Sequence, residues 1–314
     1  MSRNAYCVLR DEYCLFHVFT QRANFYPIRQ GFDKLYAITS NHYTIAETVM
    51  LNQFIIAFIL SAFIALLAYW RGSLSPSGAA AAMIVGILIF GLGDWQWGIL
   101  LVLFFLSSSL LSHYREDDKQ AVADEKFDKN HRRDAAQVFA NGGVGALVAV
   151  LNTAVPSPFW FPAFVGVMAS VTADTWATEL GTLSQKPPRL ITNGRIVPVG
   201  TSGGISVLGT AVSFGGGLFI GLAAGLLFQH TIIAFALIGG LAGLAGSLSD
   251  SLLGATVQQI YICDVCGKET EKKRHCGQPS RPLRGWNWMS NDLVNLVSSM
   301  VGGVTAVLLS LLLR

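Results

Sequence analysis

The sequence predicts an all-α fold, a polytopic bundle of about eight transmembrane helices. Of its 314 residues, 52% are hydrophobic and only 13% are charged, whereas a soluble domain carries about 25% charged residues. The mean hydropathy is +0.48. The 32 glycines agree with a closely packed bundle, because small residues let membrane helices approach each other. This composition excludes an ordinary soluble enzyme.

Eight apolar segments approach the roughly 20 residues that a membrane-spanning helix needs. The second is short, so it is a tilted span, a re-entrant segment or part of its neighbour, and the count ranges from about seven to nine. Residues 1–48 are predicted to be an appendage that is poorly ordered or not native, and residues 49–314 the transmembrane domain. The predicted spans lie near residues 50–70, 78–93, 95–113, 136–155, 159–181, 204–228, 231–257 and 292–313.

Basic residues gather in alternate loops. Sixteen Lys and Arg residues occupy the loops after the first, third, fifth and seventh spans, while the short loops between the other spans contain none. Cytoplasmic loops carry an excess of Lys and Arg, so the loops 114–134, 182–203 and 258–290 are predicted to be cytoplasmic, with the C-terminus outside. The N-terminal appendage, with five Lys and Arg, would also lie outside, which fits this rule poorly.

Acidic side chains interrupt three of the apolar segments. A carboxylate at membrane depth is costly and rarely faces lipid, so Asp174, Asp250 and Asp292 are candidate catalytic residues. Glu179 is a fourth candidate, but it lies about 140° from Asp174 around a helix. The two therefore do not form a simple pair, and one would hold a metal while the other holds a basic side chain or a backbone group. The alternative for Glu179 is a water-exposed position at the membrane edge.

A series of cations and amides leads into the fourth span. Lys129, Arg133, Gln137 and Asn141 are spaced four apart, so they share one face of a continuous helix. Arginine binds phosphate through a planar fork and lysine as a point charge, so we predict a track for phosphate oxygens. The alternative is a basic anchor that reaches up to the membrane surface.

Two further polar segments stand at the starts of spans. Small residues before the sixth span would expose backbone N–H groups that favour an anion, although helix caps and tight turns use the same residues. In the last span, an N-cap role would explain Asn291 or Asp292, but not Asn295 one turn deeper. The candidate residues for binding substrate or nucleotide phosphate here are Gly200, Thr201, Gly203, Gly204, Asn291 and Asn295.

One loop contains four potential zinc ligands, Cys263, Cys266, His275 and Cys276. A structural zinc site needs four nitrogen or sulphur ligands, which this set would supply. The last two are adjacent in the chain, which is awkward for ligands of a single ion. The alternatives are reduced thiols without a metal and a catalytic role.

Acids, amides, cations and a glycine-rich loop thus converge at one predicted membrane face. Such groups suit Mg²⁺-assisted phosphoryl transfer, in which positioning and charge neutralisation supply most of the catalysis. The sequence has no Walker A motif and no kinase-type glycine loop. The chemistry would therefore depend on a different arrangement of the same kinds of group.

Five of these motifs, in this order, resemble the DUF92/TMEM19 family of membrane proteins, whose plant member is phytyl-phosphate kinase. The resemblance covers about residues 50–314, and the motif style is loosely similar to that of CTP-dependent phytol and dolichol kinases. The residues that carry it are Lys129…Arg133-Asp-Ala…Gln137-Val…Asn141-Gly, Asp174-Thr-Trp-Ala-Thr-Glu-Leu-Gly181, Gly200-Thr-Ser-Gly-Gly-Ile-Ser206, Gly246-Ser…Asp250-Ser…Gly254-Ala-Thr…Gln258 and Asn291-Asp292…Asn295.

The resemblance implies CTP-dependent phosphorylation of an isoprenoid monophosphate, such as phytyl or geranylgeranyl phosphate, to the diphosphate. It implies that Asp174, Asp250 and Asp292 bind or organise Mg²⁺, and that the glycine-rich loop binds the nucleotide. The chain has Ser202 where the family pattern has Asn, which leaves the backbone role of the loop open. The implied partners are a membrane lipid and a nucleoside triphosphate, with no nucleic acid.

Two other functions use similar groups. A transporter or flippase also needs intramembrane acids, but transporter sites tend to lie at the bilayer midplane, whereas these motifs cluster at one face. A cytidylyltransferase acting on lipid headgroups would release pyrophosphate, while a kinase would release the nucleoside diphosphate. Product identity therefore separates the two enzymes.

Overall fold

The computed structural model describes residues 50–114, 132–228 and 231–313. The chain divides into two compact units, Met1–Leu51 and Asn52–Arg314. Nearly all of the first unit, and with it the predicted appendage 1–48, lies outside the described residues, as do Lys129 and most of the loop 114–134. The second unit carries the bundle and the candidate site.

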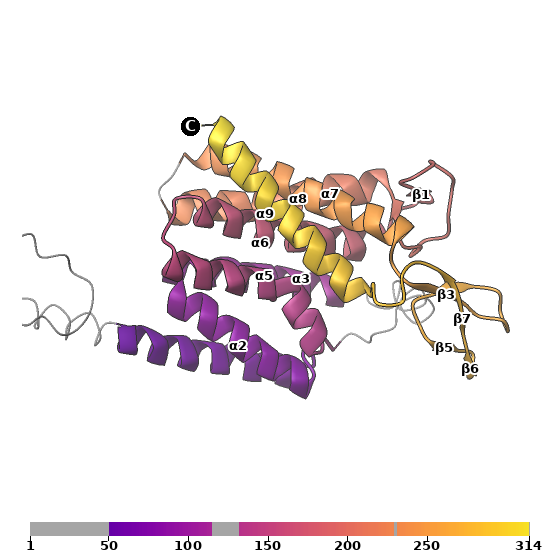
Figure 1. Cartoon of the computed structure of the whole chain (residues 1–314), viewed down its shortest axis with the longest axis horizontal. Helices are drawn as coiled ribbons and strands as arrows, with labels where there is room; N and C mark the ends of the chain where they lie inside the picture. Colours follow the sequence, from indigo (N-terminus) through magenta and orange to yellow (C-terminus); the bar gives the residue numbers. More distant parts are fainter. Residues whose placement is uncertain (1–49, 115–131, 229–230, 314) are drawn as a thin grey trace, which may run out of the picture. The chain divides into compact units, whose positions relative to one another are not determined.

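Eight helices occur within the described residues, and successive helices run in opposite directions (Figure 1). Each coincides with one predicted span apart from a few residues at its ends. The predicted all-α membrane bundle is therefore confirmed, with a few short strands added. The helices are the first helix Met50–Trp70, α2 (Pro76–Leu92), α3 (Trp95–His113), α5 (Ala135–Ala154), α6 (Trp160–Gly181), α7 (Val207–Leu227), α8 (Ile232–Thr256) and α9 (Asn291–Leu312).

Helix α6 occupies the centre of the bundle. By length and composition, six of the described helices can cross a membrane; α2, with 17 residues, and the more polar α6 are the other two. Helix α6 packs against α3, α5, α7, α8 and α9, and every residue from Pro162 to Ala173 is buried. The acid-bearing end of α6, from Asp174 to Gly181, is only partly buried. The apolar part of the helix therefore seats it among the other helices, and the acids stand at one end of the bundle.

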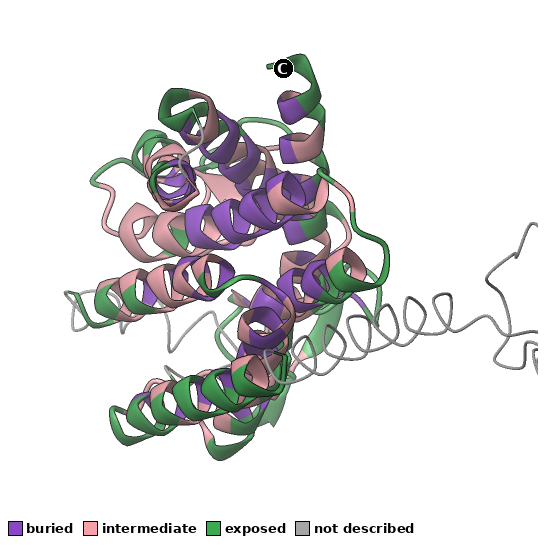
Figure 2. Ribbon diagram, turned by 90° about the vertical axis from the view of Figure 1, so that its left-hand side faces the viewer, coloured by how far each residue is buried: buried purple, intermediate pink, exposed green. Residues whose placement is uncertain are grey.

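The outer surface of the bundle is rich in exposed hydrophobic side chains. Large hydrophobic side chains such as Phe58, Phe63 and Trp70 on the first helix are exposed, while buried residues concentrate on the inner helices (Figure 2). Close contact inside requires glycine: a Cβ on Gly166 of α6 would clash with the carbonyl oxygen of Gly302 in α9. This inside-out distribution is typical of a bundle solvated by lipid.

Side-chain caps fix the starts of several helices. Ser75, Ser206 and Ser290 each accept a hydrogen bond from the backbone N–H three residues further on, at the starts of α2, α7 and α9. Asp134 and Gln137 form a capping box at the start of α5. All four starts lie at the end of the bundle where the strands are drawn (Figure 1).

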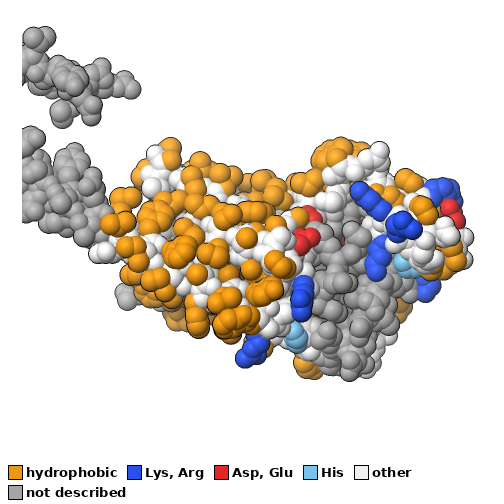
Figure 3. Space-filling model, turned by 90° about the horizontal axis from the view of Figure 1, so that it is seen from below, with side chains coloured by type: hydrophobic (Ala, Val, Ile, Leu, Met, Phe, Trp, Pro, Cys, Tyr) orange, Lys and Arg blue, Asp and Glu red, His pale blue; other side chains and the backbone are white. Residues whose placement is uncertain are grey.

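Short antiparallel strands order the two longer loops at this end. In the loop between α6 and α7, β1 (Arg189–Leu190) pairs with β2 (Gly204–Ile205). In the loop between α8 and α9, β3 (Ile260–Ile262) lies between β4 (Glu269–Thr270) and β7 (Arg281–Arg284), and β5 (Arg274–His275) pairs with β6 (Gln278–Pro279). Charged side chains gather at this end, whereas hydrophobic side chains cover the bundle (Figure 3).

Candidate active site

A cavity of about 490 Å³ lies among α3, α5 to α9 and the two strand-bearing loops. Its lining includes the polar site residues that the sequence predicts, with two exceptions. Lys129 is outside the described residues, and the cysteine cluster does not line the cavity. The chemical roles of these side chains stay predictions. The predicted residues that line the cavity are Arg133, Gln137, Asn141, Asp174, Glu179, Gly200, Thr201, Gly203, Gly204, Asp250, Asn291, Asp292 and Asn295.

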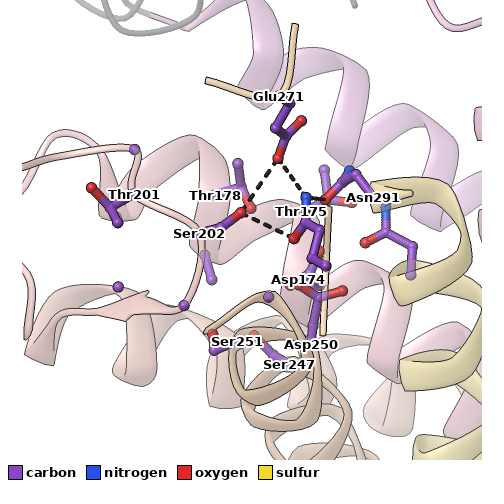
Figure 4. A pocket seen from close by; sticks show the side chains of 18 of the residues that line it. Asp174, Thr175, Thr178, Thr201, Ser202, Ser247, Asp250, Ser251, Glu271 and Asn291 are labelled. Carbon is purple, nitrogen blue, oxygen red and sulfur yellow. Dashed lines mark hydrogen bonds between the residues drawn. The ribbon is translucent and has the colours of Figure 1, made fainter. Parts of the chain in front are cut away.

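Two of the acids form the floor of the cavity (Figure 4). The Asp174 carboxylate accepts a hydrogen bond from Ser247, whose hydroxyl lies 3.0 Å from that of Ser213. The Asp250 carboxylate accepts a hydrogen bond of 3.3 Å from Ser298. The two carboxylates repel each other, so a cation between them would be stabilised.

A third carboxylate, Glu271, enters the cavity from the segment between β4 and β5. It accepts hydrogen bonds from the Gln258 amide at 2.8 Å and the Ser202 hydroxyl at 3.4 Å, and Gln258 also lies 3.5 Å from Asn291 (Figure 4). Glu271 repels Asp250 as well. Reasoning from the sequence missed Glu271, because only the strand pairing of its loop brings it back over the end of α8.

The cavity acids do not form a preassembled metal cage. Among the described residues, only one group of three or more His, Cys, Asp or Glu has all its ligand atoms within 4.8 Å, and it is the cysteine cluster. Asp292 lines the cavity but does not close with Asp174 and Asp250 into one compact set. Magnesium is usually held by one or two carboxylates, with water and phosphate oxygens completing its shell. The Asp174–Asp250 pair, supported by hydroxyl groups, fits that requirement.

A basic side chain lines another part of the cavity. The Arg133 guanidinium lies 5.9 Å from the centre of the Phe105 ring and within electrostatic range of Glu179. Burial lowers the pKa of Arg133 and Glu179 raises it in part, but arginine stays protonated in proteins. Glu179 also accepts a hydrogen bond of 2.7 Å from Ser112. Glu179 thus accompanies a cation while Asp174 lies with Asp250, which is the division that their helical angle predicts.

The prediction that one continuous helix reaches Asn141 from before Arg133 is wrong, because α5 begins at Ala135. Asp134 is the N-cap of α5, so Arg133 precedes the helix, and the Gln137 side chain accepts a hydrogen bond of 3.1 Å from the Asp134 backbone. The cap forms because the first N–H groups of a helix have no partner within it. Arg133, Gln137 and Asn141 nevertheless line one side of the cavity.

The glycine-rich segment forms a tight loop beside the cavity. Gly200 and Gly203 have φ angles of 80° and 83°, which favour glycine. A Cβ on Gly203 would also clash with Ala255 of α8. Arg284 donates a hydrogen bond of 3.4 Å to the Ser202 carbonyl and so ties this loop to the strand β7. The turn alone thus accounts for the two glycines, and the N–H groups of Thr201 and Gly204 donate to carbonyl groups within it, so the anion-binding role of the loop stays a prediction.

Three helices, α5, α7 and α9, begin at this cavity. Gln137, Gly209 and Asn291 from their first turns all line it, and helix N-termini favour negative charge. The N-cap of α9 is Ser290, so the N-cap explanation for Asn291 or Asp292 is wrong, and both line the cavity instead. The arrangement suits a ligand with several anionic oxygens.

A smaller apolar cavity adjoins the polar one. It lies among the first helix, α2, α3 and α5, with side chains such as Ile64, Val85 and Phe105 in its wall. Its polar rim is made of Arg133, Gln137 and Asn141, which also line the polar cavity. The apolar cavity measures only about 80 Å³, so beside the polar cavity it offers room for the first carbons of an amphiphile and not for a whole long tail.

An apolar helical bundle with a cavity of acids, amides and a half-buried cation at one end defines a polytopic integral membrane protein with a polar site at one face. Sequence comparison then places the chain: it belongs to the DUF92 integral membrane protein family, whose model matches residues 59–303.

Several curated proteins are similar to this chain. Protein PGR of Arabidopsis thaliana is 33% identical over 281 residues, which cover 81% of this chain and 95% of that protein. The membrane protein MJ0933 of Methanocaldococcus jannaschii is 32% identical, covering 75% of this chain and 85% of its own. The chloroplastic protein VTE6 of Arabidopsis thaliana is 26% identical, covering 75% and 65%. No solved structure matches the chain.

Proposed function

We propose that the protein is a membrane kinase that transfers a phosphoryl group from a nucleoside triphosphate, CTP by family resemblance, to an isoprenoid monophosphate such as phytyl or geranylgeranyl phosphate. The observation that carries this proposal is the shared wall of the two cavities, formed by Arg133, Gln137 and Asn141. A phosphate head beside Arg133 would place the first carbons of an isoprenoid tail in the apolar cavity, which measures about 80 Å³, and the rest of the tail in the surrounding lipid.

The polar cavity offers separate places for the two phosphate-bearing substrates. Arginine presents a planar fork to phosphate, so Arg133 would bind the lipid phosphate. The Gly200–Gly204 loop and the start of α7 would bind the nucleotide phosphates through backbone N–H groups. A magnesium ion held by Asp174 and Asp250 would neutralise charge on those phosphates.

The reaction balances without a strong base in the protein. A phosphate oxygen of the lipid attacks the γ-phosphorus of the nucleotide, the bond to the β-phosphate oxygen breaks, and the nucleoside diphosphate leaves with that electron pair. A phosphate monoester is largely dianionic at neutral pH, since its second pKa is about 6. The residues of the chain would hold the attacking oxygen in line with the bond that breaks, and would stabilise the negative charge of the phosphate groups.

The cavity would face the cytoplasm. It opens at the end of the bundle that carries the basic loops, and Lys and Arg mark cytoplasmic loops. Single cysteines introduced at Arg195 and at Asp94 in cells test this orientation with a membrane-impermeant thiol reagent. Labelling at position 94 alone in intact cells supports the proposal, and labelling at position 195 alone contradicts it.

A direct assay tests the activity. Purified protein in lipid nanodiscs is supplied with Mg²⁺, CTP or ATP, and phytyl, geranylgeranyl or longer polyprenyl phosphates. We expect an isoprenoid diphosphate and a nucleoside diphosphate in equal amounts by mass spectrometry. A CDP-lipid with pyrophosphate would indicate a cytidylyltransferase instead, and absence of turnover in folded protein would overturn the proposal.

A further inference from the structure

The tightest cluster of metal-ligand side chains in the described part of the chain lies outside the cavity. Cys263, Cys266, His275 and Cys276 bring one ligand atom each within 4.8 Å of all the others. They come from two turns in the loop between α8 and α9: one joins β3 to β4, and the other joins β5 to β6. Neither the proposed kinase reaction nor the polar cavity uses them.

The first turn presents two sulphurs on one side. The Gly267 N–H donates to the Cys263 carbonyl at 2.8 Å, and Gly267 has a φ of 69°, so the chain reverses directly after Cys266. The backbone N–H groups of Cys266 and Val265 point at the Cys263 sulphur. The sulphur atoms of Cys263 and Cys266 thus lie within 4.8 Å of each other.

The second turn explains how adjacent residues both contribute a ligand. His275 pairs with Gln278 across β5 and β6, so Cys276 and Gly277 form a two-residue hairpin turn with φ angles of 50° and 76°. Cys276 is the only described residue other than glycine with a positive φ. A conformation of this kind persists only where its surroundings enforce it. Here it turns the Cys276 side chain back toward His275.

The distances fit a tetrahedral ion. The His275 Nδ1 atom lies 3.5 Å from the Cys266 sulphur and 3.3 Å from the Cys276 sulphur. In a zinc site with Zn–S of about 2.3 Å and Zn–N of about 2.0 Å, two such ligands stand roughly 3.5 Å apart. The difficulty that adjacency posed in the sequence is thus removed by the backbone of the turn.

We propose that Cys263, Cys266, His275 and Cys276 bind one structural zinc ion. Four nitrogen and sulphur ligands complete the tetrahedron and leave no position for substrate. The ion would join the two turns, and the chain between them carries Glu271 and Lys273 into the polar cavity. Zinc would therefore set the shape of one wall of the cavity without taking part in chemistry.

Metal analysis of the intact protein tests the proposal directly. We expect one zinc per chain by mass spectrometry after purification without added metal, and an X-ray absorption spectrum with three sulphur neighbours and one nitrogen neighbour. The Cys266→Ser variant should lose most of the zinc. The control, a Cys7→Ser, Cys14→Ser double variant, should keep all of it. Cobalt substitution of the natural chain gives a second readout, a tetrahedral thiolate spectrum, that does not depend on any variant folding.

Other outcomes overturn the inference. A disulfide between two of these cysteines, stoichiometric iron, or reactive thiols with no metal would each exclude a structural zinc site. These measurements need no turnover, so failure here is distinct from failure of the kinase proposal. Removal of zinc by a chelator should also increase hydrogen exchange in residues 258–290 and leave α2 and α3 unchanged; no increase would show that the ion does not order the loop.

Discussion

The carboxylates of the cavity and the cysteine cluster of the neighbouring loop are candidate metal sites of opposite design. Asp174 on α6 and Asp250 on α8 repel each other and belong to no compact set of three ligands. The four cysteine and histidine ligands lie on two turns of one loop, where only Cys263 is buried, and their ligand atoms converge within 4.8 Å. An incomplete shell lets substrate oxygens enter, whereas a complete one excludes them. Ligand spacing is therefore the ground on which we propose a chemical role for the acid pair and a structural role for the cysteine cluster.

The largest effect should come from the acid pair. Asp174→Asn keeps the size of the side chain but removes the charge, so we expect turnover to fall by about 10² to 10³-fold, comparable to other losses of electrostatic stabilisation. Zinc content should be unchanged if the two sites are independent. Asp94→Asn is the matched control, because Asp94 is exposed and forms no side-chain cap at the start of α3. Full activity of Asp174→Asn would remove the acid pair from the mechanism.

The second test concerns Arg133, the basic side chain in another part of the cavity lining. Arg133→Lys retains the charge but loses the planar fork, and a hydrogen bond to a charged group contributes about 1.5–3 kcal/mol. We expect kcat/KM for the lipid phosphate to fall by about 10 to 100-fold. Arg132→Lys, at an exposed neighbour, should behave like the natural protein. Equal kinetics for both variants would argue that Arg133 only anchors the loop.

The third test concerns the packing of the glycine-rich loop Gly200–Gly204 against α8. Gly203→Ala combines a positive φ with a clash against Ala255, so we expect a loss of stability of about 2–4 kcal/mol. Gly194→Ala shares the positive φ but meets nothing within 4 Å, so its loss should be about 1 kcal/mol. Thermal unfolding in detergent measures the difference. Equal melting temperatures would show that the loop does not pack on α8 as described.

The smallest effect should come from Glu271, which lies in the cavity and on the segment that joins the two turns of the cysteine cluster. Glu271→Gln keeps the shape of the side chain but removes a negative charge beside Asp250, so the Mg²⁺ concentration needed for half-maximal activity should rise by up to about tenfold. Zinc removal should change the same parameter in the same direction, because it frees the segment that holds Glu271. Glu269→Gln, outside the cavity lining, is the control. A change in zinc content in Glu271→Gln would show that the two sites are not separable.

Most of the bundle and much of the site were predictable from the sequence, for identifiable reasons. Hydrophobic segments and Lys/Arg counts locate helices and their ends, so Asp174, Asp250 and Asn291 could be assigned to one face before any coordinates. Two things could not be predicted. Whether Asp134 caps α5 or continues a helix depends on competing local hydrogen bonds, and the placement of Glu271 depends on strand pairing in a loop of low regularity.

The rim shared by the two cavities has a consequence for the fate of the product. Arg133, Gln137 and Asn141 separate the polar compartment from an apolar one that lies among the outer helices. A lipid that enters and leaves between those helices diffuses in two dimensions within a single leaflet, and its hydrocarbon chain never crosses water. An isoprenoid diphosphate formed there would pass directly to the next membrane-bound enzyme in that leaflet, so turnover would depend on lateral exchange rather than on desorption.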